Sequence, residues 1–348
     1  MAEQWRPKTH TFHFPIGEAT ITLQDVQILW GLPINGDVAL GVWHSLTPDQ
    51  WSDFAGQYLG IDVHPNNIKS GHILISALCA ELNEPIGETE RSHQQRARVY
   101  LLAALSSFLF PDCNSTSALL NYVQNLINFE RLSWGIAVLA HVYRNLCCTA
   151  EKTDQSGING AMLLVQHWVY ARIPSLAPRL LNNIVLTSND TLKGPYSVRW
   201  YGRRSFEQTP THVLSTCRSG FGLSALRPNE FLWLPYRTII NRLPDECRVD
   251  VNLWTYRGAI LFWATIEIHL PDRANGMNAQ LGAICLRRGW AFPDFGGTSQ
   301  VDHNVHDVMN LGDDEPDPQP QQLRRSDRVS NPPRCGTGGH KHGHRRGR

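Results

Sequence analysis

The strongest constraint on the fold is a succession of helix start and stop signals separated by short links. Thr47-Pro48-Asp49 combines an N-cap residue, a proline at the first helical position and an acid in the first turn. Pro111 and Pro174 end two later apolar runs, because the residue before a proline avoids the α conformation. We expect helices over residues 47–60, 70–82, 90–110, 117–130, 133–148 and 161–173. The sequence therefore predicts a mainly α fold, a multi-helix globular domain.

A small β-hairpin and a capped helix are predicted near the N-terminus. Residues 9–14 alternate with the period of two that is typical of a strand, and Gly17 allows a tight turn. Thr22 lies three residues before Asp25, which is the spacing of a capping box. The helix that follows is expected to end at Gly31, a residue that readily adopts a left-handed conformation.

The second half of the chain is less regular and its last part changes composition. The apolar stretches 231–236 and 260–270 each suit a strand or a buried helix. After about residue 290 an acidic, proline-rich run is followed by a basic segment rich in glycine and histidine. Such a segment buries too little apolar surface to offset chain entropy. We therefore expect one domain over residues 1–290 and a disordered C-terminal tail over residues 291–348.

Composition favours a globular chain in a reducing compartment. Of the 348 residues, 42% are hydrophobic and 18% are charged, which suits a packed core. The formal net charge of +1 gives no global reason to expect nucleic acid or an anionic membrane as a partner. The N-terminus lacks the apolar region of a secretory signal, and the longest apolar runs fall short of a membrane span. The eight cysteines form no CxxC pair, so we expect free thiols.

Two groups of basic residues are candidates for binding. The tail group suggests nuclear targeting or salt-sensitive contact with nucleic acid, and the alternative is a solvated tail without a partner. The tail group comprises Arg324, Arg325, Arg328, Arg334, Arg345, Arg346 and Arg348. The body group mixes aromatic rings with guanidinium groups, which can stack on bases or pack against each other in the protein. The body group comprises Arg199, Trp200, Tyr201, Arg203 and Arg204, and we favour the packing interpretation.

No metal site or cofactor site is predicted. The spacing of Cys335, His340, His342 and His344 matches no structural zinc pattern, so we expect only adventitious binding there. His10 and His13 are interpreted as hydrogen-bonded structural residues of the first strand.

The sequence also lacks the local signatures of common enzyme classes. It has no P-loop, no GxSxG elbow and no HExxH helix. None of its five lysines lies in the setting of a pyridoxal phosphate Schiff base. We therefore expect a protein that is not an enzyme. A metal-dependent nuclease stays open as an alternative, because the acidic residues are scattered through the chain.

Six segments, taken in order, resemble blocks of the plant mobile domain, a family also labelled aminotransferase-like or MAIN-like. The first is THTFHFPIGEATITLQDVQILWGLPINGD, and the third contains the Ser-Trp-Gly motif of RLSWGIAVLAHVYRNLCCTA. The six segments are Thr9–Asp37, Arg96–Asp112, Arg131–Ala150, Gly160–Pro174, Leu226–Tyr236 and Ile266–Arg273. Each block alone is weak evidence, and their number and order carry the resemblance.

The resemblance implies a nuclear role without known catalytic residues. Members of the family occur inside transposable elements and as domesticated plant genes. Domesticated MAIN-like members are implicated in meristem maintenance, transposon silencing and genome stability, and some are fused to or partnered with a phosphatase-7-like protein. The resemblance therefore implies partners among phosphatase-7-like proteins and other nuclear silencing factors. A transposon-borne relic without a host role is the alternative.

Two departures from the family pattern concern the ends of the domain. Family members usually carry helical sequence ahead of the block that begins here at Trp5. After Arg273 the segment Ala274–Met277 differs from the usual continuation. These departures suggest a copy of the domain that is shortened at both ends.

Overall fold

The computed structural model describes residues 1–41, 43–111, 116–151, 158–177, 192–200 and 226–271. Over these residues the chain is mainly helical, with three small antiparallel sheets, which confirms the mainly helical part of the predicted fold class. Within these ranges no helix is both long and apolar enough to cross a bilayer. Residues 291–348, which were predicted to be a disordered tail, lie outside the described ranges.

The N-terminal sheet contains the predicted hairpin and one additional strand. β2 (Thr11–Phe14) and β3 (Gly17–Ala19) form the hairpin, with His13 opposite Glu18. β1 (Trp5–Arg6) pairs antiparallel with the other edge of β2, and this strand was not predicted. Gly17 has a φ of 133°, a conformation that side chains rarely permit, so glycine suits the turn.

α1 (Leu23–Trp30) begins and ends where local signals predicted. The Thr22 hydroxyl accepts a hydrogen bond from the Asp25 amide, and the Asp25 carboxylate accepts one from the Thr22 amide at 2.8 Å. Gly31 ends the helix in the left-handed conformation, with φ of 67°. The capping box therefore satisfies two amides that the first turn of a helix otherwise leaves unpaired.

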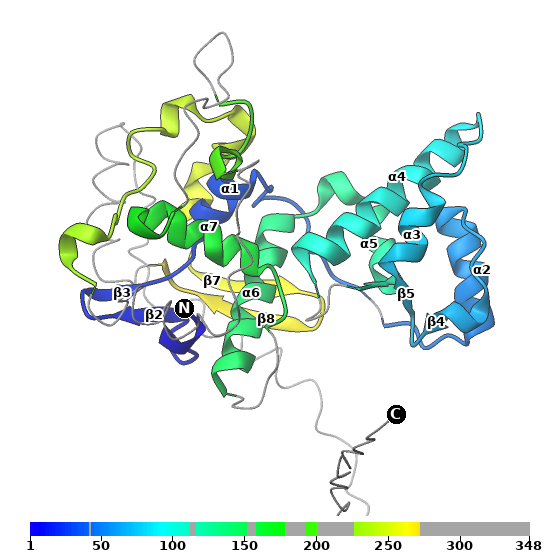
Figure 1. Ribbon diagram of the computed structural model, residues 1–348, viewed down its shortest axis with the longest axis horizontal. Coiled ribbons are helices and arrows are strands. Elements are labelled where there is room, and N and C mark those ends of the chain that lie inside the picture. Colours follow the sequence, from blue (N-terminus) through cyan, green and yellow to red (C-terminus); the bar gives the residue numbers. More distant parts are fainter. Residues whose placement is uncertain (42, 112–115, 152–157, 178–191, 201–225, 272–348) are drawn as a thin grey trace, which may run out of the picture. The chain divides into compact units, whose positions relative to one another are not determined.

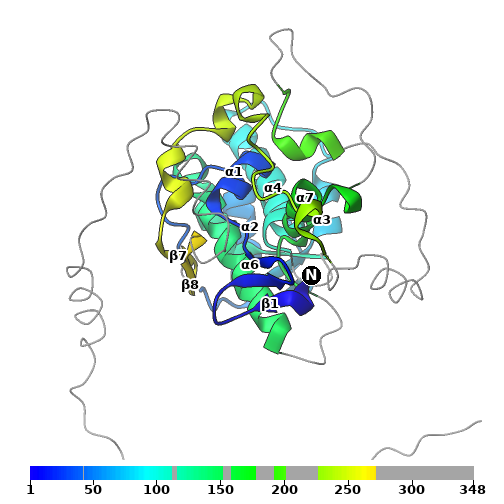
Figure 2. The same ribbon diagram turned by 90° about the vertical axis from the view of Figure 1, so that its left-hand side faces the viewer.

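The first group of helices consists of α1, α6 (Trp134–Glu151) and α7 (Met162–Arg172), and α6 is its central element. It packs against α1 and against the hairpin of β7 (Gly258–Phe262) and β8 (Thr265–His269), as Figures 1 and 2 both show. α7 packs against α1 and ends just before Pro174, as predicted. The 260–270 stretch, for which the sequence left strand and helix open, therefore forms most of a β-hairpin that covers α6.

A second group of helices forms around α4. It comprises α2 (Pro48–Leu59), α3 (Ile75–Glu81), α4 (Glu90–Ala104) and α5 (Val123–Leu126). The sequence signals for α2 are confirmed, since Thr47 forms a capping box and Gly60 ends the helix with a positive φ. α4 continues into a π-helical turn, Leu105–Leu109, before Pro111. α2, α3 and α5 all pack on α4.

Two predicted helices begin later than the sequence suggested. β4 (Ile68–Lys69), β5 (His72–Leu74) and β6 (Ser117–Leu119) form a sheet in the order β4-β5-β6. The prediction of helix from residue 70, and again from residue 117, was therefore wrong for the first residues of each range. Pairing of Ile73 with Ala118 joins segments that are far apart in the chain, which a local pattern does not reveal.

Short 3-10 helices complete the described part of the chain. They are η1 (Ala2–Gln4), η2 (Pro65–Asn67), η4 (Leu120–Tyr122), η5 (Phe129–Arg131), η6 (Pro174–Leu176), η7 (Tyr196–Trp200), η9 (Pro228–Glu230), η10 (Ile240–Arg242), η11 (Asp245–Cys247) and η12 (Val251–Thr255). Residues 231–236 form neither a strand nor a helix, so both interpretations of that stretch were wrong. Its apolar side chains are nevertheless used, since Phe231 and Tyr236 are buried.

The segment between α1 and α2 connects the two groups of helices. The Asp37 amide donates to the Arg131 carbonyl at 2.7 Å, and the Asp37 carbonyl accepts from the Ser133 amide at 2.9 Å. The Phe110 ring stacks on the Phe262 ring with centroids 4.0 Å apart and an angle of 10°. Backbone pairing and aromatic packing thus join the end of the second group to α6 and to the β7–β8 hairpin.

Candidate functional site

Three side chains that can bind a cation meet beside the end of α6. His10 lies in the turn before β2, Cys147 lies near the end of α6, and Glu267 is the middle residue of β8. One imidazole nitrogen, the thiol sulfur and one carboxylate oxygen all lie within 4.8 Å of one another. We call these three residues the His-Cys-Glu cluster. Among the described residues, no other group of three or more His, Cys, Asp or Glu side chains brings its ligand atoms this close together.

The backbone of His10 is held in an uncommon conformation that aims its ring into the cluster. His10 has a φ of 53°, in the left-handed region that residues other than glycine seldom adopt. Its amide donates to the Arg6 carbonyl at 2.9 Å, and its carbonyl accepts from the Thr20 hydroxyl at 2.6 Å. These two bonds offset the cost of the backbone conformation, which is of order 1–3 kcal/mol.

Each member of the cluster has a defined polar partner. His10 Nε2 lies 3.1 Å from Glu267 Oε2, and His10 Nδ1 lies 2.9 Å from the Ile268 carbonyl oxygen. Since a carbonyl can only accept, Nδ1 carries the hydrogen in this contact. The Trp5 indole donates to Cys147 Sγ at 3.2 Å. The indole and imidazole rings stack with centroids 6.0 Å apart, which fixes the orientation of both.

The cluster favours positive charge on the imidazole. Burial by itself lowers the pKa of His10, because it removes the charged ring from water. Hydrogen bonds with Cys147, Glu267 and the Ile268 carbonyl outweigh burial and raise this pKa from 6.5 to about 10. A proton or another cation is therefore stabilised beside His10 Nε2.

A second buried polar cluster lies between α1 and α7, and we call it the Asp-Arg-Tyr cluster. Arg172 Nη1 lies 2.8 Å from Asp25 Oδ1, and the Tyr236 hydroxyl donates to the same oxygen at 2.8 Å. The two charged side chains are 1% and 0% exposed. The Arg172 guanidinium also lies over the Trp168 ring, 4.8 Å from its centroid. All four groups are therefore engaged with one another inside the core.

The charges of the Asp-Arg-Tyr cluster support each other. Burial lowers the pKa of Arg172, but the Asp25 carboxylate outweighs this effect and the pKa is raised, so the guanidinium stays charged. Burial raises the pKa of Tyr236, so its hydroxyl remains a donor. Asp25 also accepts from the Thr22 amide and hydroxyl through its other oxygen, each at 2.8 Å. This arrangement braces the fold and leaves the Asp25 carboxylate little capacity for a substrate.

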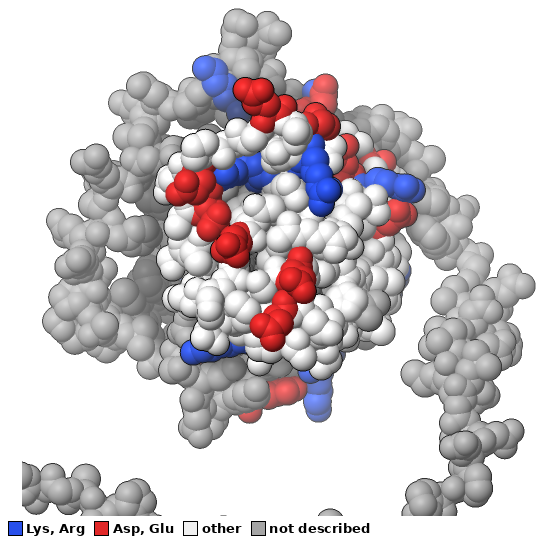
Figure 3. Space-filling view, turned by 90° about the vertical axis from the view of Figure 1, so that its right-hand side faces the viewer, with Lys and Arg blue, Asp and Glu red and all other residues white. Residues whose placement is uncertain are grey.

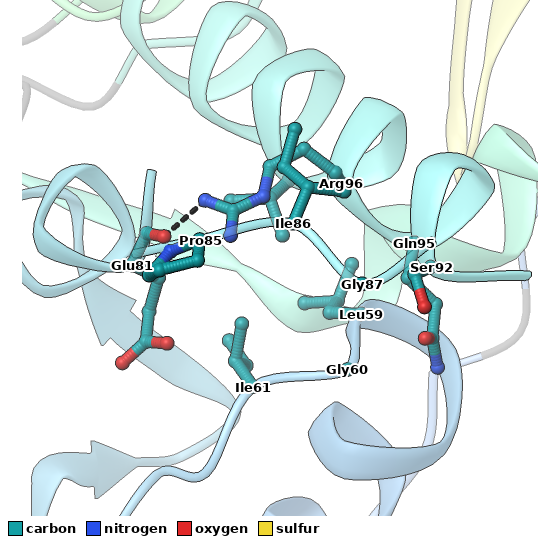
Figure 4. A pocket seen from close by; sticks show the side chains of 11 residues that line it. Leu59, Gly60, Ile61, Glu81, Pro85, Ile86, Gly87, Ser92, Gln95 and Arg96 are labelled. Carbon is teal, nitrogen blue, oxygen red and sulfur yellow. Dashed lines mark hydrogen bonds between the residues drawn. The ribbon is translucent and has the colours of Figure 1, made fainter. Parts of the chain in front are cut away.

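The surface of the described residues includes two hollows with defined linings. The first has a volume of about 130 Å³ and lies between the end of α2 and the start of α4. Figure 4 shows the Arg96 side chain beside this hollow, with its guanidinium donating to the Glu81 carbonyl. A second, apolar hollow of about 280 Å³ is lined by Trp30, Phe108, Leu163 and His167, among others. Neither contains the His-Cys-Glu cluster or the Asp-Arg-Tyr cluster.

The body group of basic and aromatic residues is described only in part. Trp200 is buried and stacks on His167, with centroids 5.4 Å apart. The Arg199 guanidinium lies over the Tyr196 ring, 4.5 Å from its centroid. Both residues therefore pack against aromatic neighbours within the protein. Tyr201, Arg203 and Arg204 lie outside the described residues.

The tail group also falls outside the described residues, as do the potential metal ligands of the tail. The residues concerned are Arg324, Arg325, Arg328, Arg334, Arg345, Arg346 and Arg348, together with Cys335, His340, His342 and His344. Their predicted roles in targeting, nucleic-acid contact or adventitious metal binding stay predictions.

Sequence reasoning singled out one member of the His-Cys-Glu cluster and missed the other two. His10 was interpreted as a hydrogen-bonded structural residue, and it does make such bonds. Its contact with Cys147 and Glu267 depends on the packing of β8 and the first turn against α6. The neighbouring His13 instead pairs with Glu18 across the hairpin, at 3.4 Å. No spacing in the sequence signals this cluster, because its members come from three distant segments.

Comparison with known proteins identifies related sequences. The profile of the family described as "Plant mobile domain" matches residues 1–283. The chain is 30% identical over 325 residues to the Arabidopsis thaliana serine/threonine-protein phosphatase 7 long form homolog, covering 90% of this chain and 24% of that protein. It is 29% identical over 278 residues to protein MAIN-LIKE 2 of the same plant, covering 78% of this chain and 40% of that protein.

A third Arabidopsis thaliana relative is protein MAINTENANCE OF MERISTEMS. It is 26% identical over 319 residues, which cover 90% of this chain and 62% of that protein. The chain thus spans less than two thirds of the length of each of these relatives. No solved structure matches the chain.

Proposed function

The chain belongs to the plant mobile domain family, and on that premise we propose that it is a nuclear, non-enzymatic factor in transposon silencing and meristem maintenance. The observation that carries the proposal is the match over residues 1–283, which includes all the described residues. The name of one relative, MAINTENANCE OF MERISTEMS, supports the meristem role. The tail group of arginines supports the nuclear location, because short runs rich in arginine are typical of import signals.

A non-enzymatic role is supported by how the buried polar groups are used. Asp25, Arg172 and Tyr236 bind one another in the core, where they hold α1 and α7 together. Neither of the two hollows described above is lined by these residues. On the face seen in Figure 3, acidic and basic side chains are interspersed over a largely uncharged surface. This pattern suits contact with proteins better than contact with the phosphate backbone, which attracts a continuous basic surface.

For a partner, we propose a phosphatase-7-like protein acting with other nuclear silencing factors. The support is the relative named serine/threonine-protein phosphatase 7 long form homolog, which contains a segment similar to 90% of this chain. Affinity purification of the tagged full chain from plant nuclei tests this partner. Recovery of a phosphatase-like protein is the expected result, and its absence from repeated purifications of stable, nuclear protein would remove this part of the proposal.

Nuclear location is tested with a fluorescently tagged full chain in plant cells. The tail variant replaces all seven arginines of the tail group by glutamine, and we expect it to lose nuclear accumulation. The matched control replaces the exposed body residues Arg91 and Arg237 by glutamine, and we expect it to stay nuclear. Exclusion of the unaltered protein from nuclei would contradict the proposal.

The silencing role is tested in plants that lack the gene. We expect raised transposon transcripts and disturbed meristems, both restored by the unaltered coding sequence. Normal transcripts together with normal meristems would instead favour a transposon-borne relic. The nuclease alternative is tested with purified protein, DNA and divalent cations, and metal-dependent cleavage would overturn the non-enzymatic assignment.

A further inference from the structure

The His-Cys-Glu cluster presents the donor atoms that zinc prefers. Zn²⁺ in proteins is bound by histidine nitrogen, cysteine sulfur and carboxylate oxygen, at about 2.0–2.3 Å in tetrahedral geometry. Bond lengths of that size place neighbouring ligand atoms roughly 3.3–3.8 Å apart. In the cluster all three atoms lie within 4.8 Å of one another, and His10 Nε2 is already 3.1 Å from Glu267 Oε2. Small side-chain rotations are enough to reach metal-binding distances.

Hydrogen bonds around the cluster orient two of the three ligands. A metal-binding histidine usually donates its other ring N–H to a carbonyl or a carboxylate, which fixes the tautomer and the ring orientation. His10 makes such a contact through Nδ1 to the Ile268 carbonyl at 2.9 Å, so Nε2 is directed at Cys147 and Glu267. The Trp5 indole donates to Cys147 Sγ at 3.2 Å, and a donor at this position stabilises a thiolate.

The acceptor atoms that meet at the centre of the cluster also favour a bound cation. In the tautomer fixed by the Ile268 carbonyl, neutral His10 presents its Nε2 lone pair to the Glu267 carboxylate. Two acceptors this close repel each other unless a positive charge lies between them. A proton meets this need, and so does a divalent metal ion, which also balances the charges of a thiolate and a carboxylate.

The cluster is largely buried and still reachable from solvent. Cys147 is 7% exposed, and the side chains of Glu267 and His10 are 9% and 17% exposed. The ligands thus lie in a region of low dielectric, where attraction to a cation is stronger than in water. The partial exposure of the imidazole leaves a path for an ion from solvent.

We propose that His10, Cys147 and Glu267 bind one Zn²⁺ ion that fastens the N-terminal turn and β8 to the end of α6. A water molecule takes the fourth position of the tetrahedron. Binding displaces the proton of the Cys147 thiol and the Nε2 proton of the His10 imidazolium, while Nδ1 keeps its hydrogen on the Ile268 carbonyl. The ion cross-links segments that are far apart in the sequence and keeps one position open to water, and its presence does not depend on the function proposed above.

The test uses the purified full chain, stripped of metal by a chelator and dialysed. His340→Ala, His342→Ala and His344→Ala are introduced together, so that the tail histidines do not contribute binding. Isothermal titration with ZnCl₂ is expected to give one ion per chain. Titration with Co²⁺ is expected to give the near-ultraviolet charge-transfer band of a thiolate ligand, and zinc is expected to raise the melting temperature.

Variants separate the cluster from other thiols. Loss of a group that only orients a metal ligand lowers metal affinity by ~10–100-fold. Cys147→Ser and Glu267→Gln each change a ligand itself, so we expect each to weaken zinc binding by at least that factor. The matched control is Cys148→Ser, which alters the next residue of α6 and leaves Cys147 in place. We expect the control to bind zinc as the parent does. Circular dichroism of each metal-free variant establishes that it is folded.

Three results would overturn the proposal. The first is a folded parent protein that binds no zinc at one ion per chain. A second is equal zinc affinity in the parent and in folded Glu267→Gln and Cys147→Ser proteins. The third is a cobalt charge-transfer band that survives Cys147→Ser and is lost in Cys148→Ser.

Discussion

Replacing Arg172 by methionine provides the sharpest test of how the core is held together. The change removes the guanidinium and keeps a long apolar side chain, so the space between α1 and α7 stays largely filled. Asp25, which is fully buried, then loses the cation at 2.8 Å from its carboxylate. Tyr236 and Thr22 still donate to Asp25, but both are neutral donors.

The size of the effect follows from the burial of both partners. Removing one partner of a buried ion pair costs about 3–5 kcal/mol, because a charge is left without compensation in a region of low dielectric. A whole domain is stable by only about 5–15 kcal/mol, so this is a large fraction of the total. Tyr236→Phe is a milder change, which removes one hydrogen bond to a charged group and should cost about 1.5–3 kcal/mol.

The assay is denaturation by urea, followed by circular dichroism and analysed by linear extrapolation. Arg172→Met, Asp25→Asn and the double variant complete a thermodynamic cycle. The double variant should cost about as much as either single change, because it leaves no unpaired charge. The magnitude of the resulting coupling energy equals the cost of one single change, about 3–5 kcal/mol, which is at or above the upper end of values for residues in contact.

An exposed ion pair is the matched control. Arg248 Nη2 lies 2.6 Å from Asp245 Oδ1, but these side chains are 39% and 85% exposed. Arg248→Met should therefore cost less than about 1 kcal/mol. The reasoning is refuted if Arg172→Met costs no more than this control, or if the effects of Asp25→Asn and Arg172→Met simply add.

Three further predictions concern other parts of the fold. In metal-free protein, folding raises the pKa of His10 from 6.5 to about 10. The protonated imidazole therefore stabilises the folded state fully below pH 6.5, and this stabilisation is lost as the pH rises through about 10. Denaturation measured from pH 6 to pH 10 should show this decline, and His10→Asn should flatten it, since asparagine tolerates the positive φ. Gly135→Ala should lower the free energy of unfolding by about 1–3 kcal/mol, because the alanine Cβ would lie 2.9 Å from the Pro33 carbonyl oxygen. This cost outweighs the better helix propensity of alanine. A raised melting temperature would contradict the close contact. Trp5→Phe keeps an aromatic ring, though a smaller one, and removes the donor to Cys147 Sγ, so zinc affinity measured by titration should fall about tenfold. An unchanged affinity would show that the indole N–H does not support the site.

Much of the helical part of the fold could be predicted because its signals are local. The Thr22–Asp25 capping box, the Thr47 cap and the proline stops act within a few residues, and the structure places α1, α2 and α7 where these signals indicated. The hairpin of β2 and β3 was predictable for the same reason, since its turn needs only Gly17 and an alternating strand.

The errors occurred where distant segments pair. Residues 72–74 and 117–119 have helical neighbours, yet they form β5 and β6 because each satisfies the backbone groups of the other. Residues 231–236 looked like a regular element, but they form an irregular stretch whose apolar side chains fill the core. Local propensity is weak compared with the burial and pairing that the tertiary structure supplies.

The sequence by itself determined the family, through the number and order of its matching blocks, and it determined the mainly helical fold class and the ends of several helices, which depend on patterns a few residues long. Only the tertiary structure brought together Asp25, Arg172 and Tyr236, and beside α6 the residues His10, Cys147 and Glu267. Burial makes these contacts strong, and burial depends on which surfaces pack together. The chemistry of both clusters was therefore decided by the packing of α1, α6, α7 and β8.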